Sequence, residues 1–217
     1  MGDDDFDISV LSDYDRACTR IRVRLINTER NGELLLNVPH REFLDLSLIY
    51  YIDMTSDKNK DVSILCTRVC NSQMAKWKIT EQELYQQAMI NMEICDEGCI
   101  ISIWDLFRDR YDADYKEDTE KDETYYIMTN KHLIYGANQL LMKNKIKDFA
   151  AYMEKDIYII PSSVNECLLL PICDGTKSPQ ELCADVVDVN KTLLPQDVLS
   201  NHVYKYDRNT EEIFIAA

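Results

Sequence analysis

Glycine is scarce in this chain. Its 217 residues include five glycines, at positions 2, 32, 98, 136 and 175. P-loop and dinucleotide-binding folds need glycine where their backbone approaches phosphate closely. The nucleophile elbow of α/β-hydrolases needs glycines around its serine so that the backbone can make a strained turn. None of these spacings occurs here, so the sequence excludes all three sites.

Strand-like and helix-like segments are mixed along the chain. Alternating or β-branched runs predict strands over 43–54, 62–70, 125–129, 132–135, 156–160 and 168–172, and a C-terminal hairpin that turns at 207–210. Turns are expected at 56–60 and 129–130. Helical spacing predicts helices over 80–93, 101–108, 144–154 and 178–191. Strands that follow one another favour an α+β fold, with mixed or antiparallel sheets and packed helices, over a regular βαβ array.

Two of the predicted helices begin at capping boxes. Thr80 and Glu83 have the required spacing, and Ser178-Pro179-Gln180-Glu181 adds a proline at the first helical position. In helix 144–154 we expect an inward face made by Ile146, Phe149, Ala150 and Met153. The inward face expected in helix 178–191 comprises Leu182, Val186, Val189 and Leu193.

The apolar residues in the segment 13–27 fit both the spacing of a helix and the alternation of a strand. A helix from Asp13 would place Tyr14, Ala17, Cys18 and Ile21 on one face. The run Ile21-Arg22-Val23-Arg24-Leu25 instead alternates strictly, as a strand does. The pattern alone leaves residues 21–27 open between helix and strand.

Acidic segments suggest how the chain is organised. Residues 1–12 read as a loosely ordered acidic leader, and 109–124 as a solvated acidic loop. We therefore expect α+β halves over 13–108 and 125–217, which could also form one domain.

Charge and hydropathy limit the partners. The formal net charge is -15 and the pI is about 4.6, which disfavours direct binding to nucleic acid. An acidic decoy of a nucleic-acid-binding protein is an alternative. No apolar run is long enough to span a membrane, and the acidic N-terminus is unlike a secretory signal. We expect a cytoplasmic protein that binds no membrane, with an unknown protein as its partner.

Metal and cofactor motifs are incomplete. Cys66 and Cys70, like Cys95 and Cys99, have a spacing that zinc allows, but no turn glycine or nearby histidine accompanies them. A near-match to a calcium loop starting at residue 112 carries Lys116 at a ligand position. We expect free thiols, no metal and no cofactor.

Ser162 and Ser163 are the candidate nucleophiles. They follow Pro161, and Ser163 stands three residues before Glu166, which is capping-box spacing. A capping serine at the start of a helical turn explains these residues without catalysis. A serine-dependent hydrolase using Ser162 or Ser163, with Glu166 beside them, is the alternative.

Several ordered strings resemble one family: "RLINTERNGELL", "VPHREFLDLSL", "NSQMAKW", "YYIMTNK", "YIIPSSVNECLLLP" and "VLSNHVYKYDR". They are similar to an uncharacterised family, a domain of unknown function from gut clostridial bacteria (Firmicutes). The resemblance spans roughly residues 6–215. Family members extend further at the N-terminus, so we expect this chain to be a shortened form or a short variant.

The resemblance implies no activity. It marks Asn71, Trp77, Asn130 and Asp207 as candidate binding residues, together with Ser162, Ser163 and Glu166. Where the family commonly has histidine, this chain has Gln73 and Asn165, so a histidine-dependent reaction would be lost. We therefore expect a binding or regulatory module without catalysis.

Overall fold

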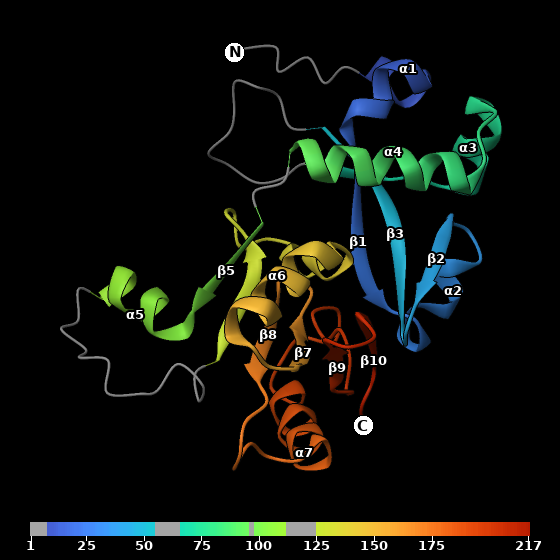
Figure 1. The fold of residues 1–217 in the computed structure, drawn as a ribbon. Coiled ribbons are helices and arrows are strands. Elements are labelled where there is room, and N and C mark those ends of the chain that lie inside the picture. The colour runs from blue at the N-terminus through green and yellow to red at the C-terminus, as the bar shows by residue number, and fades with distance from the viewer. Residues whose placement is uncertain (1–7, 55–65, 96–97, 112–124) are drawn as a thin grey trace. The chain divides into compact units, whose positions relative to one another are not determined.

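The computed structural model describes residues 8–54, 66–95, 98–111 and 125–217 (Figure 1). The chain divides into two compact units, Met1–Asp96 and Glu97–Ala217. The segment 109–124, expected to separate two halves, falls within the second unit. Its first three residues belong to a helix, and 112–124 lie outside the described residues. Of the expected leader, the described residues from Ile8 onward form a 3-10 helix.

The α+β fold class is confirmed, and the sheets are antiparallel. In the first unit, the strand order is β1-β3-β2, and β4 also pairs with β3. Its elements are η1 (Ile8–Leu11), α1 (Tyr14–Ala17), η2 (Cys18–Arg20), β1 (Ile21–Asn27), η3 (Glu29–Asn31), α2 (Gly32–Leu35), β2 (His40–Phe43), β3 (Leu46–Asp53), β4 (Cys66–Arg68), α3 (Asn71–Trp77) and α4 (Glu81–Ile94).

The ambiguous segment is a strand. Asp13 caps a helix whose α-helical part ends at Ala17, and β1 begins at Ile21. Antiparallel pairing with β3 buries the alternate residues Ile21, Val23 and Leu25. Of the two alternatives left open by the sequence, the strand is the one formed, because tertiary burial of alternate residues outweighs a local helical period.

The strand expected over 43–54 is confirmed as β3, but it begins only at Leu46, after a hairpin turn from β2. β2 ends at Phe43, which pairs with Leu46 across the turn residues Leu44 and Asp45. Leu44 has a left-handed φ of 55°. Leucine rarely adopts this conformation, so the sequence gives no signal for a turn at this position. β4, the described part of the strand expected over 62–70, pairs antiparallel with β3, while the turn expected at 56–60 lies outside the described residues.

α4 lies across β1 and β3 (Figure 1). The predicted capping box is confirmed: the N–H of Glu83 lies 3.3 Å from Thr80 Oγ1, and Thr80 N–H lies 2.7 Å from Glu83 Oε2. Leu84, Ala88 and Met92 are buried along the helix. This predicted helix therefore has both its local start signal and its apolar face.

The second unit contains a six-stranded sheet of order β10-β9-β7-β8-β6-β5. Its elements are β5 (Gly98–Ser102), α5 (Ile103–Tyr111), β6 (Tyr126–Asn130), η5 (Gly136–Leu141), α6 (Lys143–Met153), β7 (Ile157–Ser163), β8 (Glu166–Pro171), α7 (Pro179–Asn190), β9 (Tyr204–Asp207) and β10 (Glu212–Ile215). The C-terminal hairpin is confirmed. β5 was not expected, and the helix predicted over 101–108 starts only at Ile103.

Residues 129–135 differ from expectation. β6 continues through Thr129 to Asn130, so the turn predicted at 129–130 lies two residues later, at 131–132, and 132–135 form no strand. Leu133 and Tyr135 both have left-handed φ angles, of 55° and 54°. Hydrogen bonds to the Asn130 side chain hold this loop. These local bonds, together with the bond from the Tyr135 N–H to Asn165 Oδ1 at 3.0 Å, set the backbone there in place of strand propensity.

α6 and α7 pack against strand residues that point to opposite faces of the six-stranded sheet. All four predicted inward residues of α6 are buried, and Phe149 meets Tyr126 edge to face, with ring centroids 4.9 Å apart. Leu182 and Val186 of α7 pack in one cluster with Ile160. Tyr126 pairs with Leu169, whereas Ile160 pairs with Leu168. Because neighbouring strand positions point to opposite faces, the two helices cover opposite faces of the sheet.

α7 has its predicted capping box and its proline at the first turn. The inward assignment of Val189 is wrong, because its side chain is 54% exposed and lines a pocket. Leu193 lies beyond the helix end and is half-buried.

In the part of the chain that the structure describes, no helix combines the length and the apolar character needed to cross a bilayer.

Candidate functional site

The two serines of the β7–β8 hairpin have separate environments. Ser163 is buried at the end of β7 and pairs with Glu166 at the start of β8. Ser163 Oγ accepts the N–H of Asn165 at 3.1 Å and donates to Glu166 Oε1 at 2.9 Å. Ser163 thus accepts a nearby backbone N–H as a capping serine does, but the expected helical turn is wrong: residues 164–165 form a two-residue hairpin loop, because β7 and β8 pair on either side.

Replacing Ser163 with alanine should lower the free energy of unfolding by about 1–2 kcal/mol, because one turn hydrogen bond is lost and the N–H of Asn165 stays partly buried. Chemical denaturation measures this. Ser162→Ala is the matched control and should change stability by less than about 0.5 kcal/mol. Equal losses in the two variants would contradict the turn role of Ser163.

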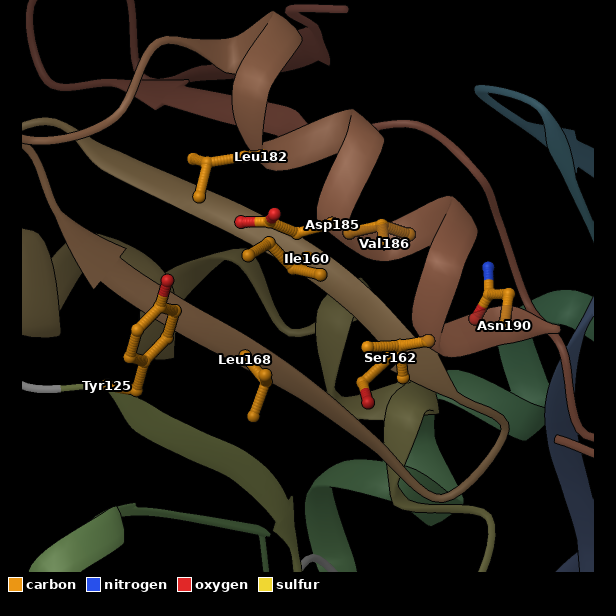
Figure 2. A pocket seen from close by; sticks show the side chains of 9 residues that line it. Tyr125, Ile160, Ser162, Leu168, Leu182, Asp185, Val186 and Asn190 are labelled. Atoms are coloured by element: carbon orange, nitrogen blue, oxygen red, sulfur yellow. The ribbon is translucent and has the colours of Figure 1, made fainter. Parts of the chain in front are cut away.

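Ser162 lines a pocket between α7 and the sheet (Figure 2). Figure 2 shows Leu182, Asp185 and Val186 of α7 facing the strands that carry Ile160 and Leu168. The pocket volume is about 170 Å³. The residues that line it are Tyr125, Ile160, Ser162, Leu168, Leu182, Asp185, Val186, Val189 and Asn190.

The pocket forms because α7 covers only part of its sheet face. Leu182 and Val186 are buried against β7 and β8. Tyr125, just before β6, and Leu168 remain half-buried beside them. The last turn of α7 ends at Asn190, whose Nδ2 donates to Ser200 O at 2.9 Å and to Asn201 Oδ1 at 2.9 Å. These bonds tie the end of the helix to the loop before β9, so the pocket wall is fixed.

Among the described residues, no histidine lies beside Ser162 in the pocket. None of the chain's three histidines lines the pocket. Asp185 Oδ2 lies 2.6 Å from Lys177 Nζ, in an exposed ion pair. Among the described residues, no hydrogen bond joins the Ser162 hydroxyl to another side chain. A serine nucleophile is activated by an adjacent base, and in the described part of the chain no side chain is hydrogen-bonded to Ser162 in that role.

The pocket lining also includes the phenol group of Tyr125. Burial raises the pKa of Tyr125, the nearby Lys177 opposes the rise, and Asp185 adds to it. Tyr125 is therefore a neutral hydroxyl at physiological pH. Apart from Tyr125, Ser162, Asp185 and Asn190 the lining is aliphatic, so the pocket can hold an apolar group and donate a hydrogen bond at its edge.

A model described as "Family of unknown function (DUF5688)" matches residues 1–208. The chain belongs to this family. The expected resemblance to an uncharacterised domain family is thus confirmed. No curated protein and no solved structure matches the chain. The residues matched by DUF5688 include every residue that lines the pocket.

Two candidate binding residues of the DUF5688 chain lie on α3. Asn71 begins the helix, and its Nδ2 donates to Leu36 O at 3.2 Å. Trp77 ends the helix, buried, with its ring centroid 5.6 Å from that of Tyr14. Gln73, at the position where the resemblance implies histidine, donates to Leu11 O at 2.9 Å. These residues join α3 to the segments before and after β1.

The other two candidates stabilise turns. Asn130 Oδ1 accepts the N–H of His132 at 3.0 Å, and Asn130 Nδ2 donates to Ile134 O at 2.8 Å. Asp207 Oδ1 accepts the N–H groups of Asn209 and Thr210. The structure thus brings Ser163 and Glu166 together, whereas Ser162 alone among the candidates lines the pocket. Asp185, Val189 and Asn190 were missed because helical spacing does not show where the sheet leaves a helix uncovered.

Among the described residues, no group of three or more His, Cys, Asp or Glu side chains is arranged to hold a metal ion. All eight cysteines are free. Cys66 lies beside Arg24, and Cys70 lies 3.1 Å from the hydroxyl of Ser72. The hydrogen bond with Ser72 lowers the pKa of the Cys70 thiol, and burial opposes this.

Proposed function

We propose that this DUF5688 protein is a non-catalytic binding module whose pocket takes one apolar side chain of a protein partner. The observation that carries the proposal is the pocket beside α7, with its volume of about 170 Å³ and its mainly aliphatic lining. An apolar cavity of about 150 Å³ is large enough to hold benzene. The space therefore suits one leucine or phenylalanine side chain better than a larger metabolite, since small-molecule sites usually span about 300–1,000 Å³.

The negative charge of the chain favours a partner whose apolar side chain, the one that would enter the pocket, is flanked by basic residues. The chain carries a net charge of -15, and Asp185 lies in the pocket wall. Lys177 already pairs with this carboxylate, but an exposed pair of this kind is weak and can exchange partners. A partner with lysine or arginine beside its apolar anchor would be attracted by the overall field.

We also propose a cytoplasmic location, which the eight free thiols support because disulfides are rare in reducing compartments.

The test uses two charge-reversed peptides that share one phenylalanine, Lys-Lys-Phe-Lys-Lys and Glu-Glu-Phe-Glu-Glu, followed by amide NMR. The basic peptide should shift resonances of residues around Ser162 and Leu168, and the acidic peptide should not. Val189→Trp, which fills the pocket mouth, should abolish the shifts. Val187→Trp, on the same helix and also exposed but outside the pocket, should retain them.

A fluorophosphonate probe separates binding from hydrolysis. Because Ser162 has no base, we expect no covalent labelling of the native protein. Labelling at Ser162 would contradict the proposal and establish the serine-hydrolase alternative. Equal loss of peptide shifts in Val187→Trp and Val189→Trp would also contradict it, because the pocket would then not be the binding site.

A further inference from the structure

Three arginines gather on one face of the first unit's sheet. Arg22 and Arg24 alternate along β1, so both point to the face opposite the buried Val23. Tyr51 of β3 pairs with Arg22 on one side and with Arg68 of β4 on the other. Residues directly opposite one another on paired strands share a face. We call Arg22, Arg24, Arg68 and Tyr51 the arginine face.

Two of the guanidinium groups are held in place. The Arg24 guanidinium carbon lies 3.9 Å from the centroid of the Tyr51 ring, and its Nη2 lies 2.6 Å from Cys66 Sγ. Arg22 Nη1 donates to Thr19 O and Ile21 O, each at 3.0 Å. Such anchoring lowers the conformational entropy that an arginine loses on binding a ligand.

Positive charge exceeds negative charge here. Asp53 is the one acidic residue among the paired positions of this face on the described strands β1, β3 and β4. Its carboxylate lies 3.9 Å from Arg22 Nη2, at the outer limit of an ion pair, and both side chains are about one-third exposed. Arg68 is exposed, and no hydrogen bond or ion pair joins it to another described residue. Arg22, Arg24 and Arg68 thus outnumber Asp53 among the described paired positions of this face on β1, β3 and β4.

Apolar side chains cover the part of this sheet face next to the arginines and leave the arginine end open to a ligand. Ile49, the next residue of β3 on this face, is buried in a cluster with Leu35 and Val38. Tyr51 packs at the margin of that cluster, so the apolar cover ends at the arginines. The face is therefore a cationic surface with an aromatic ring at its base and an apolar border.

We propose that the arginine face binds the phosphate group of a small phosphate monoester. Arg22 and Arg68 would contact the phosphate from either side of the Arg24–Tyr51 stack, because guanidinium groups match the geometry of phosphate oxygens. The ligand is small because a net charge of -15 repels a polyanion such as RNA, whereas a single phosphate senses mainly the local cations. This site lies in the first unit and is independent of the pocket in the second.

Calorimetric titration at low salt tests the proposal with three probes: inorganic phosphate, adenosine monophosphate and a short single-stranded RNA. We expect saturable binding of phosphate and of adenosine monophosphate that weakens as salt is added, and weaker binding of RNA. Tighter binding of the nucleotide than of phosphate would identify a nucleotide as the source of the phosphate group, and equal binding would identify phosphate itself.

Arg68→Gln should raise the Kd for the bound probe by about tenfold. This is the loss of affinity expected when one charge-assisted hydrogen bond is removed. Arg30→Gln is the matched control: Arg30 is exposed in η3, away from the paired strands, and its loss should change the Kd by less than about twofold. Thermal melts should show both variants folded, since neither side chain is buried. Absence of saturable phosphate and nucleotide binding, tighter binding of RNA, or equal effects of the two variants would overturn the proposal.

Discussion

Replacing Gly136 with alanine should destabilise the second unit by about 3 kcal/mol or more, an upper-range cost for overpacking. A Cβ at this position would lie 2.6 Å from the backbone oxygen of Asn165 and 2.7 Å from the backbone nitrogen of Asn130. Both atoms belong to fixed backbone. Thr129 Oγ1 also occupies this space while it donates to Asn165 O at 2.8 Å. The loop after β6 would have to leave the β7–β8 hairpin.

Gly32→Ala is the matched control for Gly136→Ala. Gly32 begins α2, with the helical φ of -53° that alanine readily adopts, and a Cβ added there would meet no atom within 4 Å. Alanine there should be neutral or should stabilise the chain by up to about 1 kcal/mol. Urea unfolding of the two variants compares them directly. If Gly136→Ala unfolds at the same urea concentration as Gly32→Ala, the close contact between the loop and the hairpin does not exist.

Replacing Glu81 with alanine should cost about 3 kcal/mol in the first unit, because it leaves buried partners without their acceptor. The hydroxyl of the fully buried Tyr50 donates to Glu81 Oε1. Arg41 forms two hydrogen bonds to the same carboxylate, at 3.1 and 2.7 Å, and its guanidinium carbon lies 3.9 Å from the Tyr85 ring centroid. The carboxylate thus joins the start of α4 to β2 and β3.

Gln82→Ala controls for the position at the start of α4. Gln82 also accepts from Arg41, at 2.7 Å, but its side chain is exposed. Its loss should cost less than about 0.5 kcal/mol. Glu81→Gln should be intermediate, since it keeps an acceptor but removes the charge. Similar losses for Glu81→Ala and Gln82→Ala would show that the network does not stabilise the fold.

The Glu81 network also predicts a pH dependence. Burial alone would raise the pKa of Glu81, but the hydrogen bonds from Arg41 and Tyr50 outweigh it and hold the pKa below its usual value. A lowered carboxyl pKa contributes stability that is present above the unfolded pKa, about 4.3, and is lost as the pH falls through the folded pKa. The stability difference between the native protein and Glu81→Gln should therefore shrink below about pH 4. A difference that is constant down to pH 3 would contradict this.

Local sequence signals predicted the helices well. Helices α4, α6 and α7 were foreseen because a capping box or a continuous apolar face is encoded within about a dozen neighbouring residues. Ser163 shows the limit of such signals. Its capping role was predicted at a helical turn, but the same serine–glutamate spacing serves a helix start and a hairpin turn.

Pairing between distant segments decided the rest. Residues 21–27 became a strand only because β3 offered a partner that buries alternate residues, and Leu44 adopted a left-handed turn because β2 and β3 pair around it. The spacing of Arg22 and Arg24 was visible in the sequence, but their convergence with Arg68 required the register of three strands.

The pocket also depends partly on local sequence signals and partly on tertiary packing. The inward positions of Leu182 and Val186 on α7 could be assigned from the residue order by helical period, but the same period wrongly placed Val189 inward. Packing against the sheet then made Val189 line an opening, since the sheet leaves the last turn of the helix partly uncovered. Ser162 and Ser163 are adjacent along the chain, yet one lines the pocket and the other holds a turn. Side-chain alternation separates them, and only packing determines what each face meets.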